Sequence, residues 1–300
     1  MNQGATTLGQ TIWAMCKDGK QFFKEQLQAH RAAEEYRDHF EDRHGLVKVL
    51  GMAQPIPLRD LYTSVQTMKR YSLYRDSKAQ IERAFRERIR NLIGGEENIR
   101  REGITVANQV RFLSVLGQPG AGKSTFLRRV GLESVLRDGS NPFRTTVAYR
   151  HACLPVLLEL KTFDPAHGLL TAIQNELSIA NFPLSFAEAA LKGGKLLLLL
   201  DGLDEVRGDQ QDAVIKAVTD FVDKHAKNRF ILSCRTAFYR SWFTRFIDVV
   251  LADFDDNQIE CFIRNWFRSE LDQQNKTVDS LLKRLRSPEH SATLELAGTP

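Results

Sequence analysis

Short apolar runs and amphipathic stretches alternate along the chain from residue 111 onward. Each apolar run has the length of one strand, and each amphipathic stretch has apolar residues at helical spacing. This alternation is typical of a parallel sheet flanked by helices. We therefore predict an α/β domain with a mostly parallel five-stranded sheet. Its strands are expected at 111–117, 154–161, 195–201, 229–235 and, more weakly, 246–252, and its helices at 123–137, 167–180, 185–192, 210–226 and 256–271.

The first 110 residues follow a different pattern. Residues 9–43 place large apolar side chains among charges, as a helix does. Residues 44–58 form a break rich in Gly and Pro, and 58–93 again mix apolar and charged residues at helical spacing, with a middle that could be loop. We predict a mostly helical N-terminal region over 1–110. Its three histidines are expected at the surface: His30, His39 and His44.

The stretch "KLLLLLDGLDEV", residues 195–206, combines an extreme apolar run with three acids. Five consecutive leucines fit a strand that is buried on both faces, as strands of parallel sheets are. Ligands of such sheets bind beyond the carboxyl ends of the strands. Asp201 stands at that end, so the run predicts a rigidly held carboxylate at a ligand site.

Residues 117–125, "GQPGAGKST", match the pattern G-x-x-x-x-G-K-[ST] between a predicted strand and a predicted helix. Glycines in such a loop let backbone N–H groups approach phosphates closely, and the following helix directs its positive end at them. We expect Lys123 to reach the β- and γ-phosphates, Ser124 to bind Mg²⁺ and Thr125 to contact the α-phosphate. The whole loop is predicted to bind a nucleotide: Gly117, Gln118, Pro119, Gly120, Ala121, Gly122, Lys123, Ser124 and Thr125. The fold is thus expected to be that of a P-loop NTPase.

A P-loop requires a partner acid for Mg²⁺, which we expect on a neighbouring buried strand. Asp201 is predicted to be that acid. Asp204 or Glu205 would then position the attacking water, and the sequence does not choose between them. The strand "RFILSCR" ends in Arg235, which we expect to sense or stabilise the γ-phosphate.

Composition and charge narrow the classes of function. The chain has 300 residues, 42% hydrophobic and 26% charged, with a net charge of +5, all ordinary for a globular protein. Residues 1–110 hold 18 Lys and Arg against 14 Asp and Glu, so the basic excess lies mainly there and not in the NTPase region. Nucleic-acid binding is possible but not indicated. The four scattered cysteines form no CxxC pair, and no apolar run reaches the ~20 residues of a membrane span. We expect a cytoplasmic protein without a signal peptide.

The motifs "GQPGAGKST", "LLLLLDGLDEV" and "FILSCR" together resemble the NACHT family of P-loop NTPases, within the STAND class of signalling switches. The segments "LPVLLELKTF" and "LADFDDNQIECFIRNWF" are also similar, and the match spans roughly 36–300. The final "LELAGTP" resembles the motif that opens the family's helical domain, whose proline contacts the base. That similarity implies a base contact for Pro300.

The resemblance implies a switch that binds ATP or GTP and ADP with Mg²⁺, hydrolyses slowly, and oligomerises when ATP replaces ADP. Bacterial relatives often act in defence against phage.

Members continue with further domains, so we expect 1–300 to be the front part of a longer protein. The expected divisions are a helical region at 1–110, the NACHT domain at 111–287 and the start of a helical domain at 288–300. Trigger and effector stay unknown. The alternatives are an AAA+-like motor on nucleic acid, a non-catalytic nucleotide-binding scaffold and a small-molecule kinase.

Overall fold

The computed structural model describes residues 22–48, 55–69, 100–135, 148–182, 184–268 and 270–290, together with residues 293 and 298. Within them, a seven-stranded sheet has the order β4-β3-β9-β5-β8-β7-β6. The strands β9, β5, β8, β7 and β6 run parallel, whereas β3 is antiparallel to both β9 and β4. The strands of this sheet are β3 (Gln66–Lys69), β4 (Arg101–Glu102), β5 (Phe112–Gly117), β6 (Leu154–Glu159), β7 (Leu196–Asp201), β8 (Arg229–Arg235) and β9 (Ile247–Leu251).

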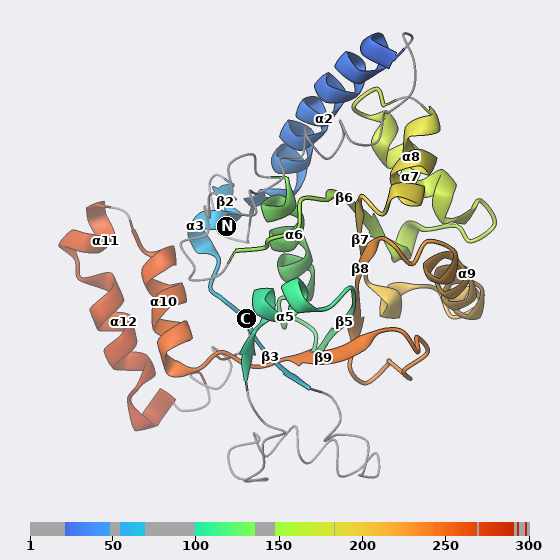
Figure 1. Ribbon diagram of the computed structural model, residues 1–300. Coiled ribbons are helices and arrows are strands. Elements are labelled where there is room, and N and C mark those ends of the chain that lie inside the picture. The colour runs from blue at the N-terminus through green and yellow to red at the C-terminus, as the bar shows by residue number, and fades with distance from the viewer. Residues whose placement is uncertain are drawn as a thin grey trace, which may run out of the picture.

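Helices cover both faces of this sheet (Figure 1). Two short strands, β1 (Leu46–Val47) and β2 (Ile56–Pro57), pair separately. In Figure 1, α5 and α6 lie on one side of the strands β5 to β8, and α7, α8 and α9 lie on the other. The helices are α2 (Phe22–His44), α3 (Leu58–Leu61), α5 (Gly103–Gln109), α6 (Lys123–Ser134), α7 (Gly168–Ser178), α8 (Leu184–Gly193), α9 (Gln211–Lys224), α10 (Asp256–Trp266), α11 (Glu270–Gln274) and α12 (Thr277–Leu285), with 3-10 turns at Leu160–Thr162, Leu203–Glu205 and Pro288–His290.

The leucine run of β7 occupies the centre of the core. Leu196 to Leu200 are each at most 1% exposed, because β6 and β8 flank the strand and helices cover its faces. Asp201 follows as the first partly exposed residue of the strand. If each leucine contributes about 2 kcal/mol on burial, this run alone contributes about 10 kcal/mol. The strand therefore fixes the backbone from which Asp201 and the following acids project.

The predicted fold class is confirmed, with corrections at the edge of the sheet. All five expected strands form, within one or two residues of their predicted bounds. The expected total of five strands is wrong, because β3 and β4 add two antiparallel strands beside β9. Residues 66–69 were expected within a helical pattern, but Thr67 is buried and pairs with Leu251 in the sheet. Tertiary pairing outweighs the weak local preference there.

Residues before 110 pack directly against the core of the α/β domain. Tyr36 and Phe40 of α2 are buried in the same apolar cluster as β5 to β8, and the Tyr36 hydroxyl donates to the Pro155 carbonyl at 2.9 Å. The expectation that His44 lies at the surface is wrong, since its side chain is buried against the Phe40 ring. His39 is partly buried, and nothing is described for the side chain of His30. The domain boundary at 110 stays a prediction.

Helices α10 and α12 form a second apolar cluster beside the main body, through Ile259, Ile263, Leu282 and Leu285 (Figure 1). Helix α10 begins where the sequence predicts, because Asp255 and Gln258 form reciprocal capping bonds of 2.9 Å. It ends at Trp266, five residues earlier than expected. Among the helices of the described ranges, none has both the length and the apolar character that crossing a membrane requires.

Candidate nucleotide-binding site

The loop from Gly117 to Gly122 has the conformation that a phosphate-binding loop requires. Gly120 and Gly122 have φ angles of 79° and 73°, a region that favours glycine. At Gly117, a Cβ atom would lie 2.9 Å from the Ala121 Cβ, so any side chain would force the loop apart. Helix α6 then starts at Lys123, directly after Gly122. The glycines therefore permit a tight turn whose backbone N–H groups precede a helix N-terminus.

Lys123 lies across this loop. Its Nζ donates to the carbonyl oxygens of Gln118 at 2.9 Å and Gly117 at 3.3 Å. Burial lowers the pKa of Lys123, the Asp204 carboxylate opposes that shift, and the Arg235 guanidinium adds to it. Asp201 also raises this pKa, so two of the three predicted acids, Asp201 and Asp204, lie within electrostatic reach of the lysine. A partly desolvated ammonium of this kind gains stability when an anion binds beside it.

The remaining loop residues suit contact with a ligand. Gln118, Pro119 and Gly120 are exposed, whereas Ala121 is buried beneath the loop. Ser124 and Thr125 are exposed in the first turn of α6, so their hydroxyl groups are accessible to a phosphate or a cation. The residues present therefore fit a nucleotide phosphate chain with Mg²⁺: a glycine cradle, one lysine and two hydroxyl groups at a helix N-terminus.

The strand order corrects one expectation about the acids. Asp201 was expected on a strand next to the P-loop strand, but β8 lies between β5 and β7. Gly117 at the end of β5 pairs in register with Arg235 at the end of β8, and Leu200 of β7 pairs with Leu232 of β8. The carboxyl ends of the three strands therefore meet at one edge of the sheet. The two predicted motifs reach each other across the end of β8.

Arg235 holds Asp204 through both its backbone and its side chain. The Arg235 backbone N–H donates to Asp204 Oδ1 at 2.8 Å, and its Nε lies 2.8 Å from Asp204 Oδ2. The Asp204 side chain is only 5% exposed, while that of Arg235 is 51% exposed. Glu205 is exposed, and its carboxyl group lies near Gly202. The structure thus separates two acids that the sequence left equivalent.

Ser233 is a site residue that the sequence analysis missed. It is 1% exposed, and its Oγ donates to Asp201 Oδ1 and accepts from the Gly202 backbone N–H at 2.8 Å. The signal was present in "RFILSCR", where a serine interrupts an apolar strand two residues before Arg235. Residues two apart on a strand face the same side, so Ser233 and Arg235 both face the acids of residues 201–205.

The far end of α6 is anchored by a buried ion pair. Arg129 Nε lies 2.8 Å from Glu133 Oε1, with the two side chains 0% and 1% exposed. The Arg129 guanidinium lies 4.4 Å from the centre of the Tyr62 ring, and Glu133 Oε2 accepts from the Tyr149 backbone N–H. The P-loop helix is therefore tied to segments before and after it in the chain.

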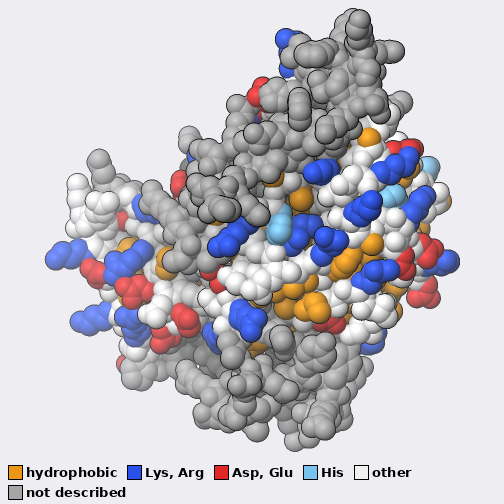
Figure 2. Space-filling model, viewed as in Figure 1, with side chains coloured by type: hydrophobic (Ala, Val, Ile, Leu, Met, Phe, Trp, Pro, Cys, Tyr) orange, Lys and Arg blue, Asp and Glu red, His pale blue; other side chains and the backbone are white. Residues whose placement is uncertain are grey.

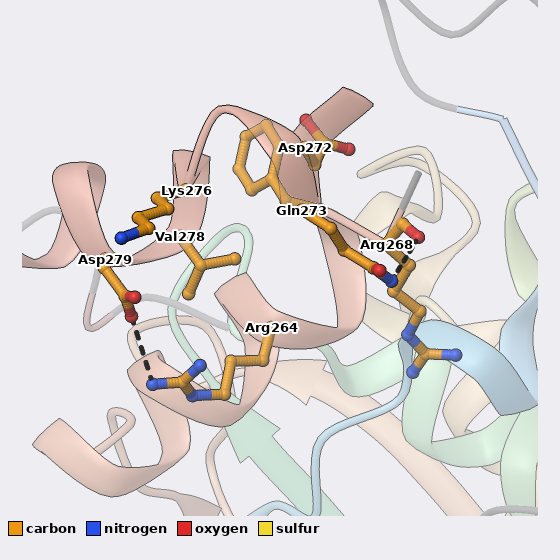
Figure 3. Close-up of a pocket in the computed structure, with 8 residues that line it drawn as sticks. Arg264, Arg268, Asp272, Gln273, Lys276, Val278 and Asp279 are labelled. Atoms are coloured by element: carbon orange, nitrogen blue, oxygen red, sulfur yellow. Dashed lines mark hydrogen bonds and ion pairs between the residues drawn. The ribbon is translucent and has the colours of Figure 1, made fainter. Parts of the chain in front are cut away.

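One cavity of the described structure lies away from this site. It has a volume of about 340 Å³ and lies between α10, α11 and α12 (Figure 3). None of the predicted site residues lines it, and Arg264 in its wall lies 3.6 Å from Asp279. Basic and acidic side chains are mixed over these helices in Figure 2. We conclude that this cavity is a gap between charge-compensated helices and not the nucleotide site.

One predicted feature receives no geometry. Pro300, expected to contact the base, lies outside the described residues, although the carbonyl of the nearby Gly298 accepts from the Phe254 N–H at 2.7 Å. Within the described ranges, no three His, Cys, Asp or Glu side chains gather into a metal cluster. A P-loop site needs no such cluster, since Mg²⁺ takes one or two protein ligands and completes its shell with phosphate and water.

A match to a known protein family agrees with this geometry. The family model of the NACHT domain matches residues 111–270, which is more than half of the chain. No curated protein matches the sequence. Among solved structures, a STAND signal-transduction ATPase with a tetratricopeptide repeat sensor from Pyrococcus horikoshii is similar at 10% identity and a TM-score of 0.32. That alignment covers 66% of this chain and 28% of the other, so this chain spans well under a third of that protein's length. The chain belongs to the NACHT family, a family of nucleotide-binding P-loop NTPases.

Proposed function

We propose that the protein is a signalling switch that binds ATP and ADP with Mg²⁺ and changes state when one replaces the other. The observation that supports this most is the meeting of three motifs at one edge of the sheet. Lys123 lies within electrostatic reach of Asp201, Asp204 and Arg235, although these residues come from three different strands and their connections. Membership of the NACHT family supports the same proposal.

In this proposal the P-loop backbone and Lys123 bind the phosphates, while the Ser124 hydroxyl and the Asp201 carboxylate hold Mg²⁺. Bound Mg²⁺ would neutralise charge on the β- and γ-phosphates. Because Asp201 follows five buried leucines, its backbone is held in place before any ligand arrives. Preorganised ligands of this kind add specificity for the metal-bound nucleotide.

We assign the two remaining acids different roles. Asp204 is nearly buried and holds Arg235, so it acts as a positioning residue. Glu205 is exposed beside Gly202, with no ion pair or hydrogen bond to its side chain among the described residues, and is the better candidate to orient and deprotonate the attacking water. Arg235 would exchange its contact with Asp204 for one with the γ-phosphate. Because ADP has no γ-phosphate, this exchange would distinguish ATP from ADP.

The finer parts of the proposal rest on the family. We propose that hydrolysis is slow and regulatory, that the ATP state self-associates, and that the pathway is innate defence, including defence against phage. The same proposal allows GTP to take the place of ATP. It also places the protein in the cytoplasm. The alternative is an AAA+-like motor that acts on nucleic acid.

One experiment separates these functions. The protein is purified, the nucleotide that copurifies is identified, and hydrolysis is measured with and without DNA or RNA. The switch predicts retained ADP and slow turnover that nucleic acid leaves unchanged. Strong stimulation by nucleic acid would favour the motor, and the absence of any nucleotide binding would contradict both.

A further inference from the structure

Strand β8 presents a buried hydroxyl to the acid that is proposed to hold the metal. The Ser233 Oγ has two partners at once: it donates to Asp201 Oδ1 and accepts from the Gly202 N–H at 2.8 Å. Ser233 is 1% exposed and pairs in register with Val115 of the P-loop strand. Ser233 therefore belongs to the strand that lies between the P-loop strand and the strand of Asp201, and its side chain is buried.

Through these two bonds, Ser233 links Asp201 Oδ1 to the backbone at Gly202. A hydroxyl that accepts from the backbone N–H has its single proton left for Asp201 Oδ1. In the described part of the chain, the other oxygen, Oδ2, has no hydrogen bond or ion pair. One carboxylate oxygen is thus held by the protein, and the second is left for a ligand.

Building on the proposed nucleotide function, we infer that Ser233 is a positioning residue that orients Asp201 for Mg²⁺ and so sets how strongly nucleotide binding depends on Mg²⁺. Hydrogen bonds to metal-ligating carboxylates are known to tune metal affinity, and their loss costs about 10- to 100-fold in that affinity. Ser233 itself touches neither phosphate nor metal in this scheme. Its effect passes entirely through the orientation of Asp201.

A purely structural role for Ser233 makes a different prediction. The hydroxyl also satisfies the Gly202 N–H, and its removal would leave that donor without its partner and destabilise the fold. A structural role alone would lower stability and leave the Mg²⁺ dependence of binding unchanged. The two roles are therefore separated by the metal dependence and not by stability.

The test compares Ser233→Ala with Ser233→Thr and Ser114→Ala. Thr keeps a hydroxyl at position 233. Ser114 is an equally buried serine on β5 whose Oγ lies 2.9 Å from the Tyr239 hydroxyl and not from an acid of residues 201–205. Affinity for a fluorescent ATP analogue is measured in EDTA and across a Mg²⁺ titration, with no hydrolysis assay involved. Circular dichroism of each variant reports its folding.

We expect Ser233→Ala to bind the analogue in EDTA as the wild type does, but to need about 10- to 100-fold more Mg²⁺ for half of the metal-dependent gain in affinity. Ser233→Thr and Ser114→Ala should keep the wild-type midpoint. An unchanged midpoint in folded Ser233→Ala would overturn the inference while leaving the proposed function intact, as would a Ser114→Ala midpoint shifted equally. Wild-type protein that binds no analogue under any condition would instead overturn the proposed function and the inference with it.

Discussion

Two ion pairs of equal length lie on elements that border the P-loop. Arg129–Glu133 on α6 and Arg235–Asp204 at the end of β8 both measure 2.8 Å between nitrogen and oxygen. In the first pair both side chains are almost completely buried, whereas in the second the arginine is 51% exposed. Distance alone therefore does not separate them. Exposure decides whether the cation is able to exchange its partner for a ligand.

The surroundings of each pair support this distinction. Arg129 lies against the Tyr62 ring, and Glu133 also accepts a backbone hydrogen bond, so release of either charge would leave it buried and uncompensated. Arg235 faces solvent beside the P-loop, where an incoming phosphate would compensate its charge. The buried pair anchors the P-loop helix, and the exposed pair is suited to respond to the ligand.

The largest effect is expected at Glu205, the acid that neither pair uses. Replacement by Gln removes the proposed base, so Glu205→Gln should slow single-turnover ATP hydrolysis by about 10²- to 10⁴-fold while ATP binding persists. Asp204→Asn should slow hydrolysis less and weaken the preference for ATP over ADP, because it loosens Arg235. A normal rate in Glu205→Gln together with a large loss in Asp204→Asn would reverse the two roles.

The buried pair should dominate stability. Glu133→Ala leaves the Arg129 charge buried without its carboxylate and should lower the free energy of unfolding by about 3–5 kcal/mol in urea titrations. The matched control is Glu260→Ala on α10, where the acid pairs with Arg264 and Arg286 at the surface. That change should lower the free energy of unfolding much less, because solvent screens the exposed pairs. Equal losses in the two variants would remove the distinction between buried and exposed pairs.

Acid should destabilise the region next to the buried pair through His44. Burial, with the nearby charges of Arg43, Arg128 and His39, lowers the pKa of His44 from 6.5 to about 4. Between pH 6.5 and about pH 4, His44 is mostly protonated in the unfolded chain and mostly neutral in the folded protein. The stabilisation is thus complete above pH 6.5 and is lost as the pH falls towards 4, by about 3 kcal/mol at most. Unfolding of wild type and His44→Gln should diverge over this range, and parallel curves would contradict the prediction.

The exposed pair should contribute least to stability and most to ligand discrimination. Arg235→Met should change the free energy of unfolding by about 1 kcal/mol or less, because the position 235 backbone N–H still donates to Asp204. It should reduce the ratio of ATP to ADP affinity about tenfold, as expected for one lost charge-assisted hydrogen bond. Arg245→Met is the matched control, since Arg245 is similarly exposed and pairs with Asp223 at 2.5 Å. A loss of discrimination in both variants would indicate a general charge effect.

The order of elements could be read from the sequence, while the order of strands in space could not. Apolar runs identified β5, β6, β7, β8 and β9, and the glycine spacing identified the P-loop, because both are local patterns. The position of β8 between β5 and β7 depends on pairing between distant segments. Without that order, Asp201 was placed on a neighbouring strand.

The same limit explains why the sequence analysis missed Ser233 and did not distinguish Asp204 from Glu205. The role of Ser233 follows only once β8 lies beside β7, and the separation of Asp204 from Glu205 depends on the side-chain contacts of Arg235. The pairing of Gln66–Lys69 arises in the same way, from contacts with a segment far along the chain. Local pattern predicts which residues carry chemistry, and tertiary contacts decide how they share it.

The central claim is that Lys123 and the acids after β7 bind one Mg²⁺-nucleotide at the carboxyl edge of the sheet. Calorimetric titration of wild type and Lys123→Ala with ATP and Mg²⁺ tests this directly, once bound nucleotide has been removed. We predict a saturable, Mg²⁺-dependent binding signal for wild type and none for a folded Lys123→Ala variant. Binding of equal affinity by the two proteins would contradict the account.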